Sequence, residues 1–237
     1  LDEASLVSVT DVNGIILYVN QNFCNLSKYS REELIGQDHY IINSDHHTKA
    51  FMENLWKTIT TGKVWHEEVK NKAKDDSYFW TDTTIVPFLN TEGKPYKYMA
   101  IRSDITKRKE FEKSLGESIS NMEAILESTA DGILVVDEGG KIVRFNKKFQ
   151  ELWSIPNEVM HTMDDNKALD SVLHQMENPQ GFLAKVQELY ANPEAISFDL
   201  IELKDGRVFE RYSQPIAMNG VNRGRVWSYR NVTERIN

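Results

Sequence analysis

Cysteine is nearly absent from this sequence of 237 residues, and long apolar runs are absent altogether. The single cysteine, Cys24, excludes an intrachain disulfide and fits a reducing compartment, so we expect a cytoplasmic protein. No stretch approaches the roughly 20 apolar residues that cross a bilayer, and no signal peptide is apparent. No membrane contact is therefore expected for this stretch of chain. Because it begins at Leu1 without Met, we expect a fragment of a longer protein.

Positive charge is also scarce. Lys and Arg number 28 against 36 Asp and Glu, which gives a net charge of −8. A phosphate backbone requires clustered basic side chains, so the composition argues against nucleic acid as a partner. The apolar fraction of 40% is ordinary for globular protein, and the length accommodates two small domains.

Motifs of catalysis are missing as well. The sequence has no Ser/His/Asp order with a nucleophile elbow, no phosphate-cradling glycine loop and no clustered metal ligands. It also lacks a kinase phosphoacceptor motif and a cyclase signature. We therefore expect no catalytic and no metal-binding residues in this chain. Any histidine kinase or diguanylate cyclase output domain is expected beyond Asn237.

An internal repeat organises the sequence. Residues 11–23 and 137–149 share Asp, Gly, Asn and Phe at four matching places, each pair 126 residues apart. The copies also end alike, since residues 101–108 are echoed by residues 229–235. One domain plan is therefore used twice.

Each copy has a legible order of elements. In the first copy the expected strands lie at residues 5–10, 15–19, 64–72, 77–89 and 96–103. The expected helices lie at residues 21–27, at 30–34, where Ser30 and Glu33 form a capping box, and at 48–61. Two strands, short helices and three strands predict an α+β fold. Each copy is expected to form a five-stranded antiparallel sheet with short helices on one face.

A helical linker is expected between the copies. Residues 107–128 lack proline and carry apolar residues at near-heptad spacing, namely Phe111, Leu115, Ile119, Met122 and Leu126. The helix either packs on its own domain or pairs with a second copy in a parallel coil, which Gly116 weakens. We expect a first domain over residues 1–106, a linker over 107–128 and a second domain over 129–237.

Three motifs of the first copy carry a family resemblance. They are Asn20-Gln-Asn-Phe23, Tyr29-Ser-Arg-Glu-Glu-Leu-Ile-Gly36 and Asp104-Ile-Thr106. In combination they resemble a PAS domain, and the repeat makes a tandem PAS pair that covers almost the whole chain. The resemblance implies the sensory module of a signalling protein.

The first copy is also similar to a narrower group, the flavin-binding PAS sensors. The similarity lies in residues 36–44, 62–65, 71–75 and 84–87. This group includes redox-sensing histidine kinases, nitrogen-fixation regulators and aerotaxis receptors, and in it an FAD lies between sheet and helices. The resemblance therefore implies FAD as the cofactor, and redox state or oxygen as the stimulus.

Asn71 is the first candidate for contact with that cofactor. The two-residue period of its strand puts it on one face with Trp65, Glu67, Val69 and Ala73. If that face is interior, an unpaired amide costs about 1–3 kcal/mol, whereas a flavin edge offers both donors and acceptors. The resemblance places a flavin-contacting Asn here. From the residues alone, a solvated Asn71 near the turn is the alternative.

Six further residues are candidates for cofactor contact: His39, Asn43, Ser44, Trp56, Trp65 and Trp80. The resemblance suggests that Trp56 stacks on the adenine, and helix packing is the alternative. Asn43 and Ser44 suit either the ribose and phosphate or the cap of the next helix. Trp65 and Trp80 suit either the cofactor wall or the core.

Other hypotheses stay open. His46-His47 before a helix offers a ligand for a haem-based gas sensor, although adjacent helical residues point about 100° apart and solvated His is the alternative. A cofactor-free PAS module for dimerisation or small-ligand binding is another, and a redox enzyme a third. His39 stands where light-sensing relatives carry their adduct-forming Cys, which excludes that photochemistry. The second copy lacks the flavin pattern, so we expect a relay or dimerisation domain with an unassigned pocket.

Asp104 and Thr106 are the predicted signal relay. They stand where the last strand gives way to the linker helix, the place for capping exposed amides. Asp104 is also placed for an ion pair with Lys107 or Arg108. Strain in the sheet would pass here into the helix. The expected partners are a second copy of the chain, through linker helix and PAS domains, and the covalently attached output domain.

Overall fold

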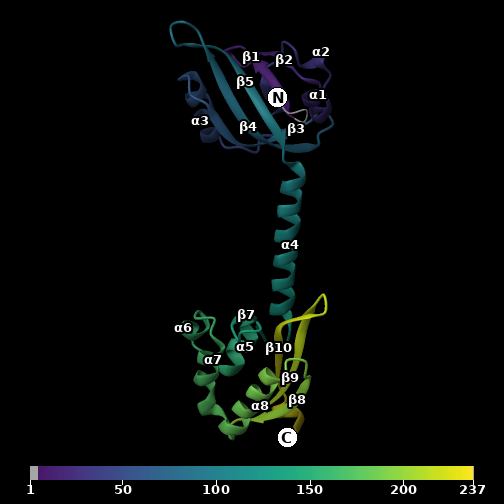
Figure 1. Ribbon diagram of the computed structural model, residues 1–237, viewed down its shortest axis with the longest axis vertical. Coiled ribbons are helices and arrows are strands. Elements are labelled where there is room, and N and C mark those ends of the chain that lie inside the picture. The colour runs from purple at the N-terminus through teal and green to yellow at the C-terminus, as the bar shows by residue number, and fades with distance from the viewer. Residues whose placement is uncertain (1–4, 237) are drawn as a thin grey trace. The chain divides into compact units, whose positions relative to one another are not determined.

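The computed structural model describes residues 5–236, and these form two compact units that divide between Gly116 and Glu117 (Figure 1). Each unit contains one five-stranded antiparallel sheet with short helices packed on it. The predicted α+β architecture, with a helix joining two similar domains, is confirmed. Over the described residues, no helix is both long and apolar enough to span a bilayer.

The first unit has the strand order β2-β1-β5-β4-β3. Its strands are β1 Leu6–Thr10, β2 Ile16–Val19, β3 Trp65–Lys72, β4 Tyr78–Leu89 and β5 Pro95–Asp104. Its helices are α1 Gln21–Ser27, α2 Arg31–Leu34, the 3₁₀ helix η1 His39–Ile42 and α3 Lys49–Thr60. The predicted strands and helices of this unit agree with these bounds to within one residue, and the predicted Ser30–Glu33 capping box is present.

The second unit repeats this plan with the strand order β7-β6-β10-β9-β8. Its strands are β6 Gly132–Val136, β7 Ile142–Phe145, β8 Ser197–Glu202, β9 Val208–Met218 and β10 Val221–Asn231. Its helices are α5 Lys147–Trp153, α6 Asn157–Met160, α7 Asp165–Val172, the 3₁₀ helix η2 Leu173–Gln175, α8 Pro179–Ala191 and α9 Thr233–Ile236. The helix α4, Thr106–Ser128, joins the units.

The repeated Asn explains part of the repeat. Asn20 Oδ1 accepts hydrogen bonds from the backbone N–H of Phe23 and of Val7, both at 3.0 Å. Asn146 Oδ1 does the same for Phe149 at 2.9 Å and Ile133 at 2.8 Å. One side chain therefore caps a helix and ties it to the first strand of its sheet, a task that an Ala cannot perform.

The cores of the two units differ. In the second unit, 19 buried apolar residues form one continuous cluster. In the first unit the buried apolar residues form two separate clusters, one around Phe23 and Leu34 and the other around Trp65 and Tyr98. The first unit is therefore not filled by apolar side chains from end to end.

Replacing Asn146 with Ala should destabilise the second unit by about 2 kcal/mol or more. The side chain is fully buried, caps α5, and donates from Nδ2 to Leu126 O at 2.9 Å and Asp131 O at 2.8 Å. Its loss leaves several buried backbone groups unpaired. Urea unfolding followed by circular dichroism measures the change.

The matched control is Asn166→Ala, because Asn166 is exposed in the first turn of α7. That variant should stay within about 0.5 kcal/mol of the wild type. Equal unfolding midpoints for both variants would contradict the structural role assigned to Asn146.

Candidate ligand cavity

A cavity of about 250 Å³ in the first unit is lined by the apolar cluster around Trp65 and Tyr98 and, from the other cluster, by Ile42. Its floor is the inner face of β1, β5, β4 and β3, and residues of η1 and α3 also line it. Small-molecule sites begin at roughly 300 Å³, so this space is close to the size that holds a flat ring system.

Polar side chains cross the floor of this cavity. Asn71 is 4% exposed, and its Nδ2 donates to Thr81 Oγ1 at 2.9 Å and to Val69 O at 3.1 Å. The Thr81 hydroxyl lies 2.9 Å from that of Thr83, which pairs across the sheet with Arg102. We call Asn71, Thr81, Thr83, Arg102, Ser8 and His39 the polar band.

The other half of the polar band surrounds a buried guanidinium. Arg102 is 4% exposed and donates to Ser8 Oγ and to His39 Nε2, both at 2.8 Å. Burial lowers the pKa of Arg102 to about 10, so it stays protonated at neutral pH. Burial, and then the charge of Arg102, lower the pKa of His39 to about 3. His39 is therefore neutral and accepts the hydrogen bond at Nε2.

Five of the predicted contact residues line the cavity: His39, Asn43, Trp56, Trp65 and Asn71. Ser44 and Trp80 are not among its lining residues. Ser44 Oγ donates to Lys70 O at 2.6 Å, and Trp80 packs against the ammonium group of Lys109 at 5.4 Å. The structure therefore brings most of the predicted set to one cavity and leaves these two outside it.

The predicted inner face of β3 is buried at Trp65, Asn71 and Ala73, and partly buried at Val69. Glu67 shares that face but is exposed, since β3 is the edge strand of the sheet. Burial of Asn71 removes the solvated alternative that the sequence left open.

Trp56 lies at one end of the cavity. Its ring meets that of Tyr98 edge to face at 6.2 Å, and it approaches the Gly14 turn so closely that a Cβ there would lie 3.2 Å from it. Gly14 also has φ of +87°, a conformation that favours glycine. Trp56 remains 38% exposed, so core packing leaves part of its ring accessible.

The His46-His47 pair is arranged for packing. His47 Nε2 accepts the backbone N–H of Lys70 at 2.8 Å, and its ring stacks on Phe51 at 4.2 Å. Burial lowers the pKa of His47, which keeps the ring neutral. Its Nε2 is thus occupied by an edge-strand hydrogen bond, which disfavours a haem ligand at that nitrogen.

Sequence reasoning missed Ser8, Thr81, Thr83 and Arg102. In β5, the residues before Arg102 are apolar or aromatic on both faces of the strand, from Tyr98 to Ile101. The two-residue period therefore does not predict which face Arg102 occupies. The Thr residues of β4 fit a strand of either orientation. A buried Arg was detectable only once the register of β5 against β1 and β4 was known.

The strand registers identify the equivalent positions in the second unit. Arg102 pairs with Leu6 and Thr83 as Tyr229 pairs with Gly132 and Arg211. By the same registers, the equivalents of Asn71, Thr81, Ser8 and Ala100 are Leu203, Phe209, Leu134 and Trp227. Four of the six positions of the polar band are thus apolar or aromatic in the second unit.

These substitutions fill the second unit. Trp227 and Phe209 are almost fully buried there and both belong to its continuous apolar cluster. The space left at the corresponding place is about 20 Å³, no more than one water molecule needs. The same fold therefore carries a cavity in one copy and a packed core in the other.

The predicted relay residues join the sheet to α4. Asp104 Oδ1 accepts from the backbone N–H and the hydroxyl of Thr106, and Thr106 Oγ1 accepts the N–H of Trp80 at 3.0 Å. The ion pair predicted between Asp104 and Arg108 does not form among the described contacts. Arg108 pairs instead with Glu68 of β3 at 2.6 Å and with Glu112 at 3.3 Å.

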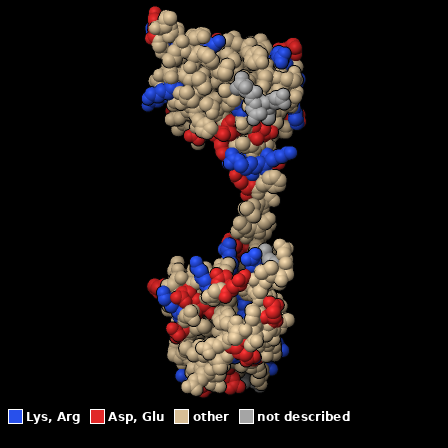
Figure 2. Space-filling model, viewed as in Figure 1, with Lys and Arg blue, Asp and Glu red and all other residues tan. Residues whose placement is uncertain are grey.

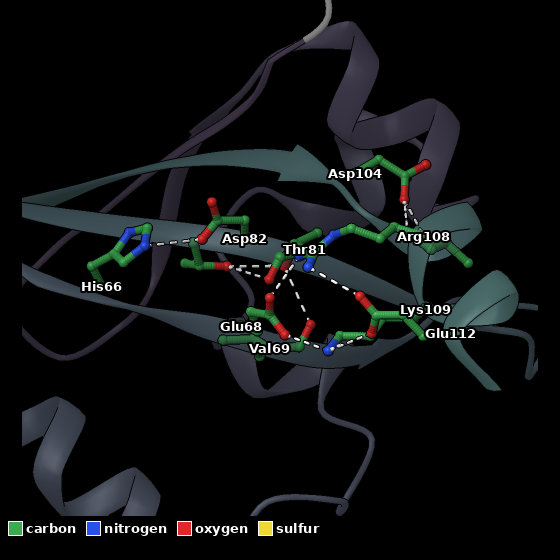
Figure 3. A network of polar contacts seen from close by, with 11 residues as sticks. His66, Glu68, Val69, Thr81, Asp82, Asp104, Arg108, Lys109 and Glu112 are labelled. Carbon is green, nitrogen blue, oxygen red and sulfur yellow. Dashed lines mark hydrogen bonds and ion pairs between the residues drawn. The ribbon is translucent and has the colours of Figure 1, made fainter. Parts of the chain in front are cut away.

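Glu68 thus adds a second attachment that the sequence did not suggest. Lys109 also pairs with it at 2.6 Å, and hydrogen bonds from Lys109 and Arg108 lower the pKa of its carboxyl. Figure 3 shows both basic side chains reaching Glu68 from α4. Acidic and basic side chains gather over the first turns of this helix in Figure 2. The start of α4 is therefore tied to β3 and β4 of the first unit.

Curated relatives of this chain are regulators and receptors. It is 28% identical over 151 residues to the nitrogen fixation regulatory protein of Klebsiella pneumoniae, which is 63% of this chain and 30% of that protein. It is 34% identical over 105 residues to the aerotaxis receptor of Escherichia coli, which is 44% of this chain and 21% of that protein. The chain thus spans less than a third of the length of either relative.

Two family models and a solved structure also match this chain. The PAS domain of a protein from Colwellia psychrerythraea aligns at 25% identity and a TM-score of 0.41, over 44% of this chain and 87% of that one. Models of the PAS domain match residues 2–107 and residues 120–185. Each match falls within one of the two units. This chain therefore belongs to the PAS family and consists of two PAS domains in tandem.

Proposed function

We propose that this chain is the sensory module of a signalling protein and binds FAD in its first PAS domain. The observation that carries the proposal is the polar band, five of whose six residues line a cavity in the first domain and four of whose positions carry packed apolar or aromatic side chains in the second. Redox state or oxygen is the proposed stimulus. This fits relatives named as a nitrogen fixation regulatory protein and an aerotaxis receptor.

The residues present fit a flavin. Its ring system has apolar faces and one edge of alternating donors and acceptors, and the cavity matches this with an apolar and a polar part. Trp65 and Tyr98 belong to the apolar part of the lining, while Asn71 and Arg102 belong to the polar part. The exposed side of Trp56 is available to stack on the adenine. The choice of FAD over FMN follows from the resemblance of residues 36–44 and 62–65 to FAD-binding sensors.

A bound flavin supplies an N5 atom that is an acceptor when oxidised and a donor when reduced. Asn71 is suited to follow that change. Its Nδ2 is held by Thr81 Oγ1, and no described residue donates to its Oδ1. A hydroxyl both donates and accepts, so Thr81 stays bonded when the amide of Asn71 turns over. In that rotation Asn71 Nδ2 gives up its hydrogen bond to Val69 O, and the Thr81 hydroxyl redirects its proton from Val69 O or Thr83 Oγ1 to Asn71 Oδ1.

The signal would then pass along β3 and β4 into α4. Asn71 and Glu68 belong to the same edge strand, and Glu68 holds Arg108 and Lys109. Asp104 and Thr106 hold the same helix to Trp80 of β4. We propose that the second PAS domain and α4 relay this change within a homodimer to an output domain that the chain does not include.

Asn71→Ala should shift the absorption spectrum or the redox midpoint of the bound flavin, because it removes the amide from the cavity floor. The control is Asn90→Ala, since Asn90 lies exposed in the turn before β5. Visible absorption and reductive titration of both purified variants give the comparison. Equal and negligible effects at the two positions would refute the contact with Asn71.

Ala100→Trp should abolish flavin binding while the domain stays folded. Ala100 lines the cavity at the position that Trp227 occupies in the second domain, and a Trp there fills the space that the ring would take. Ser103→Trp serves as the control, because Ser103 is exposed on the same strand. Both variants are reconstituted with FAD and their flavin content is compared, after circular dichroism has shown that they are equally folded. Undiminished binding in Ala100→Trp would place the flavin elsewhere.

Asp104→Ala should keep flavin and fold but uncouple flavin reduction from the position of α4. The substitution removes an exposed cap, worth about 1 kcal/mol, which is enough to bias a two-state transition. Spin labels on exposed positions of α4, in oxidised and reduced dimers, report the coupling. Glu92→Ala, in the turn before β5, is the control. Wild-type-like label distances in Asp104→Ala would exclude Asp104 as the relay.

A further inference from the structure

Arg102 is a buried cation without a carboxylate partner. The hydrogen-bond acceptors of its guanidinium in the described part of the chain are the Ser8 hydroxyl and His39 Nε2, both neutral. The ring of Phe23 lies 5.4 Å from it and adds a weak cation–π contact. Removing a charge from water costs several kcal/mol, and neutral partners recover only part of that cost.

The buried Arg side chains of the second domain are compensated differently. Arg211 makes two hydrogen bonds to the carboxylate of Asp199, at 2.9 and 2.6 Å. Arg225 donates to three backbone carbonyls, those of Asn192, Pro193 and Ala195. Arg211 also lines a hollow, of about 290 Å³, but the carboxylate of Asp199 already meets its charge there. Among these three, Arg102 alone combines a ligand-sized cavity with no carboxylate partner among the described residues. The missing counter-charge is therefore expected from the ligand.

The charges around the cavity agree with this. The titratable groups that line it with Arg102 are Asp38, His39, Tyr40, His47, Lys70 and Tyr98. Asp38 is the only carboxylate among them, is exposed, and caps η1 by accepting the N–H of Tyr40 at 2.8 Å. The pKa values of His39 and His47 are lowered by burial, so neither adds charge, whereas burial raises the pKa of Tyr98, which stays neutral. Arg102 is thus the buried charge of this cavity.

We propose that Arg102 holds the negative charge of the reduced flavin ring, so that reduction by two electrons takes up one proton instead of two. This inference rests on the proposed flavin site. In the balanced step a two-electron donor reduces the ring, one proton is bound at N5, and the remaining negative charge, shared by N1 and the adjacent carbonyl, is compensated by the guanidinium. We assign the compensating negative charge to the flavin ring and not to the phosphates. Arg102 is nearly fully buried, whereas the phosphates belong to the flexible part of the dinucleotide that would extend toward solvent.

The test is the pH dependence of the flavin midpoint potential, measured by dithionite titration of the FAD-loaded chain between pH 6 and 8. Reduction with one proton gives half the slope of reduction with two. We expect the half slope in the wild type and in Arg102→Lys, and a doubled slope in Arg102→Gln. Lys70→Gln, which removes the other cation of the cavity lining, should keep the half slope.

Each outcome decides the inference. A two-proton slope in the wild type, or an unchanged half slope in Arg102→Gln, overturns it while the flavin site stands. If Arg102→Gln fails to fold, the slopes of the wild type and of Arg102→Lys decide instead. Loss of FAD binding but not of riboflavin binding in Arg102→Gln assigns Arg102 to the phosphates and overturns the ring assignment. A wild-type chain that takes up neither FAD nor riboflavin refutes the proposed function itself, a result distinct from all of these.

Discussion

The first domain depends on one constraint, which is that its sheet carries polar side chains on the face that covers the core. Four strands turn Asn71, Thr81, Arg102 and Ser8 inward, where a domain of this size normally places apolar side chains. Buried polar groups must be paired, and here they pair largely with one another in a row across the sheet. Five of the six residues of the polar band line the cavity, beside the apolar cluster around Trp65 and Tyr98.

The second domain shows the same fold with apolar or aromatic side chains at four of the six positions of the polar band. Where the registers place Leu203, Phe209, Leu134 and Trp227, the core closes and almost no space remains. Backbone hydrogen bonds and the helix-capping Asn are common to both copies. A few inward side chains on β-strands therefore distinguish the cavity of the first copy from the packed side chains at the same place in the second, while the architecture that presents them is unchanged.

The polar band also has a mechanical consequence. Asn71 and Glu68 are three residues apart on β3, so one faces the cavity and the other faces the start of α4. In the proposed relay, a change in hydrogen bonding at Asn71 acts on the strand whose Glu68 pairs with Arg108 and Lys109. The attachment is exposed and electrostatic, so it is weak enough to be rearranged by a ligand and is sensitive to salt.

The sequence by itself determined the architecture of this protein. The repeated Asp, Gly, Asn and Phe, the capping box at Ser30 and the period of each strand depend on local hydrogen bonds and side-chain alternation, which are readable from neighbouring residues. Asn71 and Trp65 were identified as candidates for the same reason, with help from a family resemblance. Tertiary structure alone decided that Asn71 is buried, that Arg102 has no carboxylate partner among the described residues and that Glu68 holds α4. These facts depend on strand register and on residues far apart in the chain, such as Ser8 and Arg102, and local periodicity contains no information about either.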